Sequence, residues 1–147
     1  MLNIHKQSLV YFDLGYFYLV KGDNRDPDSC QESYGCDTVA VSVEEIHSVR
    51  CCSDVNIAGW RKEGTCDVWA ASDVWGQCHE MNWSDARKFC QSQSGRLCTR
   101  TELEKSCSSE TGCSYDRKLV WSSTPASDGI CNLHCLYYYN HFPYLQT

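Results

Sequence analysis

The stretch NWSDARKFCQSQSGRLCTRTEL, residues 82–103, predicts two consecutive helices and opens with the signature of a helix start. Asn82 can accept a hydrogen bond from the third helical amide, and Asp85 stands where the acidic member of a capping box would be. Three apolar side chains then share one helical face: Ala86, Phe89 and Cys90. We expect this helix to cover about residues 83–93, with Gly95 supplying a left-handed stop.

The second helix is expected to begin at a capping box. Thr99 and Glu102 have the Thr-x-x-Glu spacing in which each side chain satisfies a backbone amide of the other residue. Leu103 follows, and Cys107 stands one turn later on the same face. We expect this helix to be short and to end near the Ser108–Ser109 pair.

Strands are predicted on both sides of the helices. Val39, Val41 and Val43 alternate with smaller or polar residues, which is the period of a half-buried strand. The segment 119–121, Leu-Val-Trp, predicts another strand, which Pro125 is expected to stop.

The N-terminal residues 1–20 are apolar and aromatic but have no signal-peptide pattern. Asp13 interrupts the apolar run, and no small-x-small cleavage site follows it. The run is also too short and too aromatic for a membrane span, which needs about 20 apolar residues. We therefore expect one or two strands here and no membrane span.

The composition is that of a folded, cysteine-rich chain. Five Trp, nine Tyr and four Phe in 147 residues exclude general disorder. A net charge of -6 with 13 Lys+Arg leaves no cation surplus for phosphates, which argues against a nucleic-acid partner. Twelve cysteines, an even number, favour an oxidising compartment and hence a secreted or extracellular protein.

All twelve cysteines are expected in disulfides: Cys30, Cys36, Cys51, Cys52, Cys66, Cys78, Cys90, Cys98, Cys107, Cys113, Cys131 and Cys135. Spacing favours two local bridges, Cys30–Cys36 and Cys107–Cys113. Cys51 and Cys52 are adjacent on a strand and point to opposite faces, so they should bond two different partners. The other pairings stay open, because spacing alone does not define them.

Metal and catalytic motifs are missing from the sequence. Cys131, His134 and Cys135 are close together, but the cysteines do not form the repeated Cys-x2-Cys knuckles of a zinc site. No Gly-x-Ser-x-Gly or His-Glu-x-x-His element occurs. We expect no metal, no cofactor and no enzyme activity. Asn82 begins a glycosylation sequon, Asn-Trp-Ser, although its expected role as a helix cap is the alternative.

The helical region forms one spaced unit: Trp83-x2-Ala86-x3-Cys90-x4-Gly95-x-Leu97-x-Thr99-x2-Glu102-Leu103. This unit resembles the C-type lectin-like domain, including its hyaluronan-binding link-module branch. Upstream, Cys52, Gly59-Trp60 and Cys66 are similar to the opening hairpin of the longer forms of that domain. The resemblance covers about residues 45–135, and the cysteine richness is similar to that of extracellular domains in algae and other protists.

The resemblance implies an α+β fold in which two helices pack on antiparallel strands and the termini lie close together. It implies a bridge from Cys90 to a late cysteine, Cys131 or Cys135. It divides the chain into an N-terminal extension, residues 1–44, and a C-type lectin-like domain with an aromatic tail, residues 45–147. The family's calcium motifs, Glu-Pro-Asn or Gln-Pro-Asp with Trp-Asn-Asp, are absent, so we expect no calcium-dependent binding.

Two functions fit these features. In the first, the chain is a binding module for a glycan or an extracellular protein, and the candidate ligand-binding residues are Trp121, Asp128, Asn132, His134, Tyr137, Tyr138 and Tyr139. Core packing is the alternative role of Trp121. In the second, the chain is a structural subunit of an extracellular filament or matrix, a homo-oligomer whose contacts are the aromatic segments 8–20 and 135–144.

Overall fold

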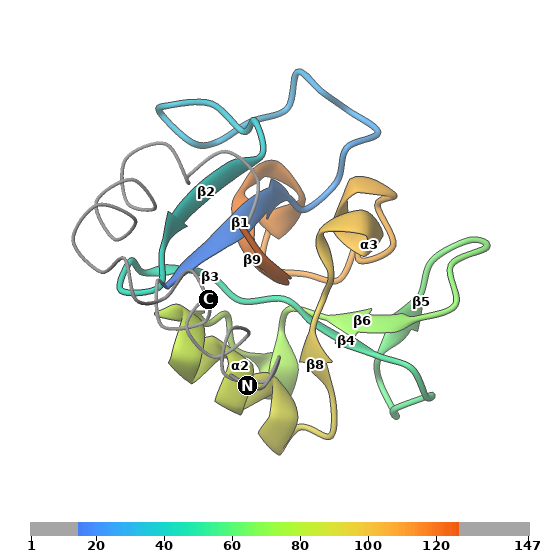
Figure 1. The fold of residues 1–147 in the computed structure, drawn as a ribbon. Helices are drawn as coiled ribbons and strands as arrows, with labels where there is room; N and C mark the ends of the chain where they lie inside the picture. The colour runs from blue at the N-terminus through green and yellow to red at the C-terminus, as the bar shows by residue number, and fades with distance from the viewer. Residues whose placement is uncertain (1–14, 127–147) are drawn as a thin grey trace, which may run out of the picture.

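The structure, a computed structural model, describes residues 15–126 and has an α+β architecture in that range. It contains a five-stranded sheet, a four-stranded sheet and two α-helices (Figure 1). The fold class expected from the sequence is thus confirmed at the level of helices packed with mostly antiparallel strands. None of the helices in residues 15–126 has the length and apolarity that crossing a membrane requires.

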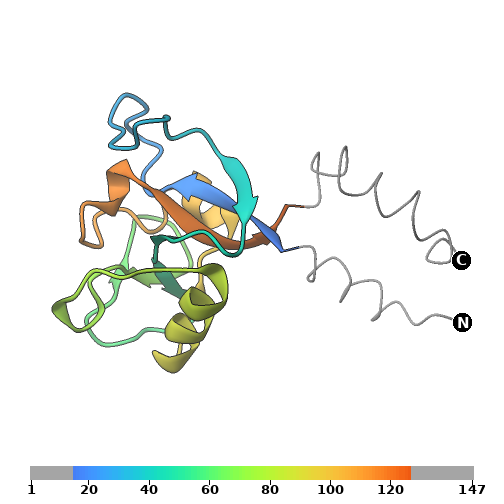
Figure 2. The ribbon, with the colours of Figure 1, turned by 90° about the vertical axis from the view of Figure 1, so that its left-hand side faces the viewer.

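The larger sheet has the strand order β2-β1-β9-β3-β7. Its strands are β1 (Tyr16–Lys21), β2 (Val39–Ser42), β3 (His47–Ser48), β7 (Glu80–Met81) and β9 (Leu119–Pro125). The backbone amide of Ala126 donates to the carbonyl of Tyr16 at 3.0 Å, so the two ends of the described chain lie side by side (Figure 2). This proximity agrees with the arrangement that the resemblance implies.

Strand β1 is an interior strand of the larger sheet. It pairs antiparallel with β2 on one side and with β9 on the other. Phe17, Leu19 and Val20 are at most 1% exposed. Strand β1, which belongs to the expected N-terminal extension of residues 1–44, therefore supplies part of the core against which the later strands pack.

The smaller sheet carries the adjacent cysteines. Its order is β5-β6-β4-β8, and its strands are β4 (Cys51–Ser53), β5 (Arg61–Lys62), β6 (Trp69–Ala71) and β8 (Arg96–Leu97). Cys51 bonds to Cys90, and Cys52 bonds to Cys98. The prediction of two different partners is confirmed, and each cysteine joins a different cluster of buried side chains.

Helix α2 (Trp83–Ser92) begins as the sequence predicts. The Asn82 side chain accepts from the amide of Asp85 at 2.9 Å. The helix ends differently, because Ser94 has the left-handed conformation at φ 64° and Gly95 does not. Gly95 is required for space, since a Cβ there would lie 2.7 Å from Trp60 Cη2.

Helix α3 (Arg100–Glu104) follows β8 and has the predicted capping box. The Thr99 hydroxyl accepts from the amide of Glu102 at 3.2 Å, and the Thr99 amide donates to the Glu102 carboxylate at 2.8 Å. The helix ends earlier than expected, and Cys107 lies in the turns that follow it. Two short 3-10 helices complete the described elements: η1 (Val74–Gly76) and η2 (Tyr115–Arg117).

Five disulfides link ten cysteines in residues 15–126: Cys30–Cys36, Cys51–Cys90, Cys52–Cys98, Cys66–Cys107 and Cys78–Cys113. The local Cys30–Cys36 bridge is confirmed. The predicted Cys107–Cys113 bridge is wrong. Cys107 bonds instead to Cys66, which precedes β6, and Cys113 bonds to Cys78, which precedes β7.

The bridge from Cys90 to a late cysteine is also wrong. Cys90 lies on the buried face of α2, and this face packs over the strand that carries Cys51. Cys131 and Cys135 lie outside the described residues.

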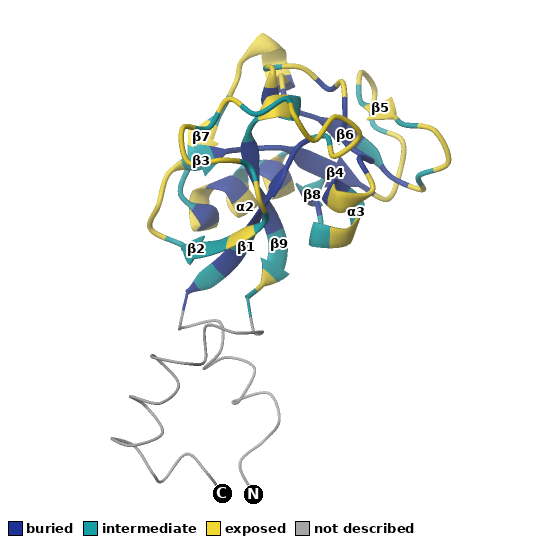
Figure 3. Ribbon diagram, turned by 90° about the horizontal axis from the view of Figure 1, so that it is seen from above, coloured by how far each residue is buried: buried dark blue, intermediate teal, exposed yellow. Residues whose placement is uncertain are grey.

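A buried arginine connects the two sheets. Arg50 is fully buried, and its guanidinium donates to the Ser72 hydroxyl at 2.7 Å, the Gly22 carbonyl at 2.9 Å and the Asp116 carboxylate at 3.0 Å. Burial lowers the pKa of Arg50, and the charge of Asp116 opposes that change. Figure 3 shows buried residues, in dark blue, along strands β1, β4 and β9.

Candidate functional site

Trp121 is the one predicted ligand-binding residue that falls within residues 15–126, and it is part of the core. Its side chain is 0% exposed, and its indole N–H donates to the Met81 carbonyl at 2.8 Å. The ring therefore has no face open to a ligand, and the alternative of core packing is the correct one. The remaining candidates lie outside the described residues: Asp128, Asn132, His134, Tyr137, Tyr138 and Tyr139.

A different tryptophan is exposed. Trp75 is 76% exposed and lies in η1, directly before Gly76. Its backbone has φ 58° and ψ 27°, which is the left-handed region. A bulky side chain rarely adopts this conformation, because its Cβ crowds the neighbouring backbone.

Trp75 is the largest side chain at positive φ among the described non-glycine residues. The others are Ser94, Ser106, Glu110, Cys113 and Ser114. Strain of about 1–3 kcal/mol persists only where the surrounding structure imposes it. Trp75 is thus held in a strained backbone while its ring faces solvent.

Two further aromatic rings lie beside Trp75. The Phe89 ring, from α2, meets the Trp75 ring edge-to-face with centroids 6.2 Å apart. The centroids of the His79 and Phe89 rings are 4.2 Å apart. Both are half-buried. We define these three residues, Trp75, His79 and Phe89, as the Trp75 surface.

Covalent and hydrogen bonds hold this segment in place. The Cys78–Cys113 disulfide ties it to the loop before η2. The His79 carbonyl accepts from the Tyr115 hydroxyl at 2.9 Å, and a ring nitrogen of His79 lies 3.3 Å from the Val74 carbonyl. Residues 78 and 79 are therefore fixed to the loop around η2, and the His79 ring links them back to Val74.

The Trp75 surface was not predicted from the sequence. The signal for it is the tetrapeptide Asp73-Val74-Trp75-Gly76, in which a tryptophan stands immediately before a glycine in a cysteine-bounded loop. Such a loop lies at the surface, so a tryptophan in it is a candidate for contact with a ligand.

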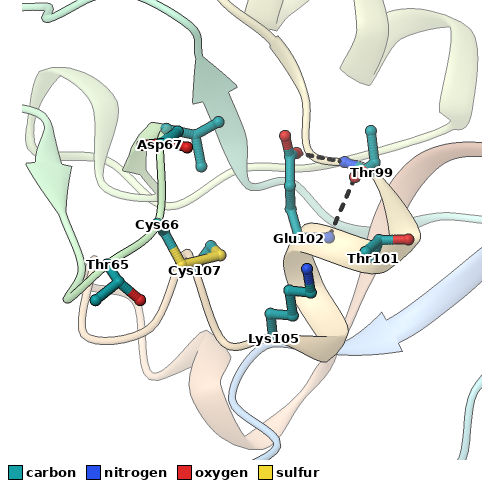
Figure 4. Close-up of a pocket in the computed structure, with 9 residues that line it drawn as sticks. Thr65, Cys66, Asp67, Thr99, Thr101, Glu102, Lys105 and Cys107 are labelled. Carbon is teal, nitrogen blue, oxygen red and sulfur yellow. Dashed lines mark hydrogen bonds between the residues drawn. A yellow bond between two sulfur atoms is a disulfide. The ribbon is translucent and has the colours of Figure 1, made fainter.

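A second candidate site is a cleft of about 730 Å³ beside α3. One wall is the segment 65–68, and the other is α3 with its flanking residues Thr99 to Cys107. Figure 4 shows the Cys66–Cys107 disulfide between the two walls. We refer to this cavity as the α3 cleft.

Glu102 lines the α3 cleft but its charge is already paired. Its carboxylate accepts from Arg96 at 2.7 Å and from the amide of Thr99 at 2.8 Å. Burial opposes ionisation of Glu102, but these hydrogen bonds outweigh it and hold the pKa below the ordinary value of 4.5. Arg96 also contacts Asp54 at 2.8 Å, which completes a three-residue ionic chain.

Within residues 15–126, one group of possible metal ligands includes Glu102. The sulfur atoms of Cys52 and Cys98 and a carboxylate oxygen of Glu102 lie within 4.8 Å of one another. The two sulfurs are joined in a disulfide, so neither is a thiolate, the form that binds metals. In the oxidised protein these three residues do not form a metal centre.

Comparisons with known proteins found no relative of this chain: no family model, no curated protein and no solved structure matches it.

Proposed function

We propose that this chain is an extracellular, non-catalytic binding module that recognises glycans through the Trp75 surface. The observation that carries the proposal is the combination at Trp75 of 76% exposure with a left-handed backbone. Neither feature helps the fold, since exposure leaves little apolar area buried and the backbone conformation is costly. A role in binding accounts for both.

The chemistry of the Trp75 surface suits sugar rings. A tryptophan ring offers a broad apolar face with little side-chain entropy to lose on binding, and the apolar face of a pyranose can stack on it. His79 supplies a polar ring next to Phe89, and Asp73 and Gln77 are exposed on the same segment. These polar groups can fix sugar hydroxyls by hydrogen bonds.

An extracellular location and a lectin-like fold are parts of the same proposal. Five disulfides are compatible with an oxidising compartment. The antiparallel pairing of β1 with β9 and the two consecutive helices support a divergent C-type lectin-like domain. The Cys51–Cys90 bridge departs from the pattern that the resemblance implies.

The second candidate function, a structural subunit of an extracellular filament or matrix, receives less support from the described residues. It needs the aromatic segment 8–20 as a contact between chains, but Phe17 and Leu19 of that segment are buried in the chain's own core. Its other contact, segment 135–144, lies outside the described residues. A filament or matrix subunit would therefore need a contact surface other than β1.

A glycan array probed with three proteins tests the proposal. We expect the wild type to retain at least one glycan, with and without chelator, and Trp75→Ala to lose it. The matched control is Tyr34→Ala, because Tyr34 is an aromatic residue with 65% exposure on the Cys30–Cys36 loop. Equal binding by Trp75→Ala and the wild type, or retention of no glycan, would contradict the proposal.

A further inference from the structure

We propose that the α3 cleft binds a small zwitterionic ligand of the amino-acid class, with Lys105 contacting its carboxylate and Asp67 contacting its amine. This site is separate from the Trp75 surface and does not depend on the proposed glycan function. The inference rests on the shape of the cleft, on its charges and on the bonds that fix its walls.

The cleft has charged groups of opposite sign on its two walls. Lys105 follows the end of α3, and Asp67 lies on the segment opposite, beyond the Cys66–Cys107 disulfide (Figure 4). Both side chains are exposed. Within residues 15–126 neither of them forms an ion pair.

The other charges around α3 are already neutralised by partners. Arg96 pairs with Glu102 at 2.7 Å, and Arg100 pairs with Glu104 at 2.6 Å. An entering ligand would therefore meet one open ammonium and one open carboxylate. Ligands with a single charge would satisfy only one of these two groups.

The walls of the cleft are fixed before any ligand arrives. The Cys66–Cys107 disulfide joins the two walls and holds the Cα atoms of these two cysteines 5.6 Å apart. The Cys52–Cys98 bridge fixes the chain just before Thr99, where α3 is capped. A preorganised site loses little conformational entropy on binding, which favours small ligands that make few contacts.

The volume and the remaining groups agree with such a ligand. A cavity of about 730 Å³ is in the range of small-molecule sites. The exposed residues Thr65 and Thr101 add hydroxyl groups to the lining, while Val68 and the disulfide add apolar surface. The hydroxyls can donate to a ligand carboxylate or accept from its amine.

A titration followed by amide chemical shifts of the full chain tests this site. The probes are three zwitterions of increasing length, glycine, γ-aminobutyrate and ε-aminocaproate, and two single-charge analogues, caproate and hexylamine. We expect at least one zwitterion to shift the amides of residues 65–68 and 99–107, with an affinity above that of both analogues. The chain length of the zwitterion that binds most tightly reports the distance between the Lys105 ammonium and the Asp67 carboxylate.

Charge-removing variants assign the contacts. Lys105→Gln and Asp67→Asn should each weaken binding of the best zwitterion by about two- to fivefold, as expected for loss of one exposed ion pair. The matched control Lys88→Gln, an exposed lysine on α2, should leave the affinity unchanged. Trp75→Ala should also leave it unchanged, which separates this site from the proposed glycan surface.

Three results would overturn the inference. The first is that no zwitterion shifts these amides. The second is that caproate or hexylamine binds as tightly as the best zwitterion, which would indicate an adventitious contact with a single charge. The third is that Lys105→Gln and Asp67→Asn bind like the wild type.

Discussion

Trp121 and Trp75 are the same residue type in two opposite environments. Trp121 is fully buried in the core cluster that strands share with helix α2, and its indole N–H donates to the Met81 carbonyl. Trp75 is 76% exposed and has a strained backbone. The two tryptophans therefore separate a side chain that stabilises the fold from a side chain that contributes little to the core and that we propose as the ligand contact. The following predictions test that division, beginning with the largest expected effect.

Trp121→Ala should produce the largest loss of stability. Truncating a fully buried tryptophan removes its transfer free energy and leaves a cavity, so the free energy of unfolding should fall by about 3–5 kcal/mol. Urea denaturation of the disulfide-intact protein measures this change. A loss below about 1 kcal/mol, the typical value for an average substitution, would show that Trp121 is not a core residue.

Asp116→Asn should have the next largest effect. It removes the carboxylate that faces the buried guanidinium of Arg50, and the loss should be about 1–3 kcal/mol, less than for a fully buried pair because Asp116 is partly exposed. Arg50→Met in the Asp116→Asn background should recover part of this loss, since no buried charge would remain. If the double variant is no more stable than Asp116→Asn alone in urea denaturation, this account of the pair is wrong.

The ionised Glu102 carboxylate at α3 is expected to make a smaller contribution to the free energy of unfolding, and this contribution should depend on pH. The pKa of Glu102 is held below 4.5 in the folded protein, so the stability it contributes is present above pH 4.5 and is lost as pH falls through the folded value. The Glu102→Gln variant should therefore lose less stability than the wild type on acidification below pH 4.5. Parallel urea midpoints for the two proteins over this range would contradict the predicted contribution.

Trp75→Ala should have the smallest effect on stability. Its ring contributes only an edge contact with Phe89, and Ala keeps the Cβ that crowds the left-handed backbone, so the net change should stay within about 0.5–1 kcal/mol. Measurement beside Trp121→Ala in the same denaturation series gives the comparison directly. A loss as large as that of Trp121→Ala would mean that Trp75 supports the fold.

Features that depend on local chemistry could be predicted from the sequence. The starts of α2 and α3 follow from Asn82 and from the Thr99–Glu102 capping box, because capping involves residues within one turn. The different partners of Cys51 and Cys52 follow from the alternation of side chains along a strand. Each of these rules acts over a few residues.

Features that depend on distant packing could not be predicted. The partners of Cys107 and Cys113 depend on which segments pass the two ends of their loop. The role of Gly95 depends on Trp60, which approaches it across the fold. The exposure of Trp75 depends on the path of η1, and a tryptophan in isolation is as compatible with a core as with a surface.

The indole N–H signals of the five tryptophans test most directly the proposal that Trp75 contacts the glycan and Trp121 does not. Neutral hexasaccharides of glucose, mannose, xylose and N-acetylglucosamine would be titrated into the labelled full chain, with the two signals assigned through Trp75→Phe and Trp121→Phe. The account predicts that at least one sugar shifts the Trp75 signal together with the amides of His79 and Phe89, while the Trp121 signal stays in place. A bound sugar that leaves the Trp75 signal unmoved, or a panel that shifts none of the five signals, would contradict it.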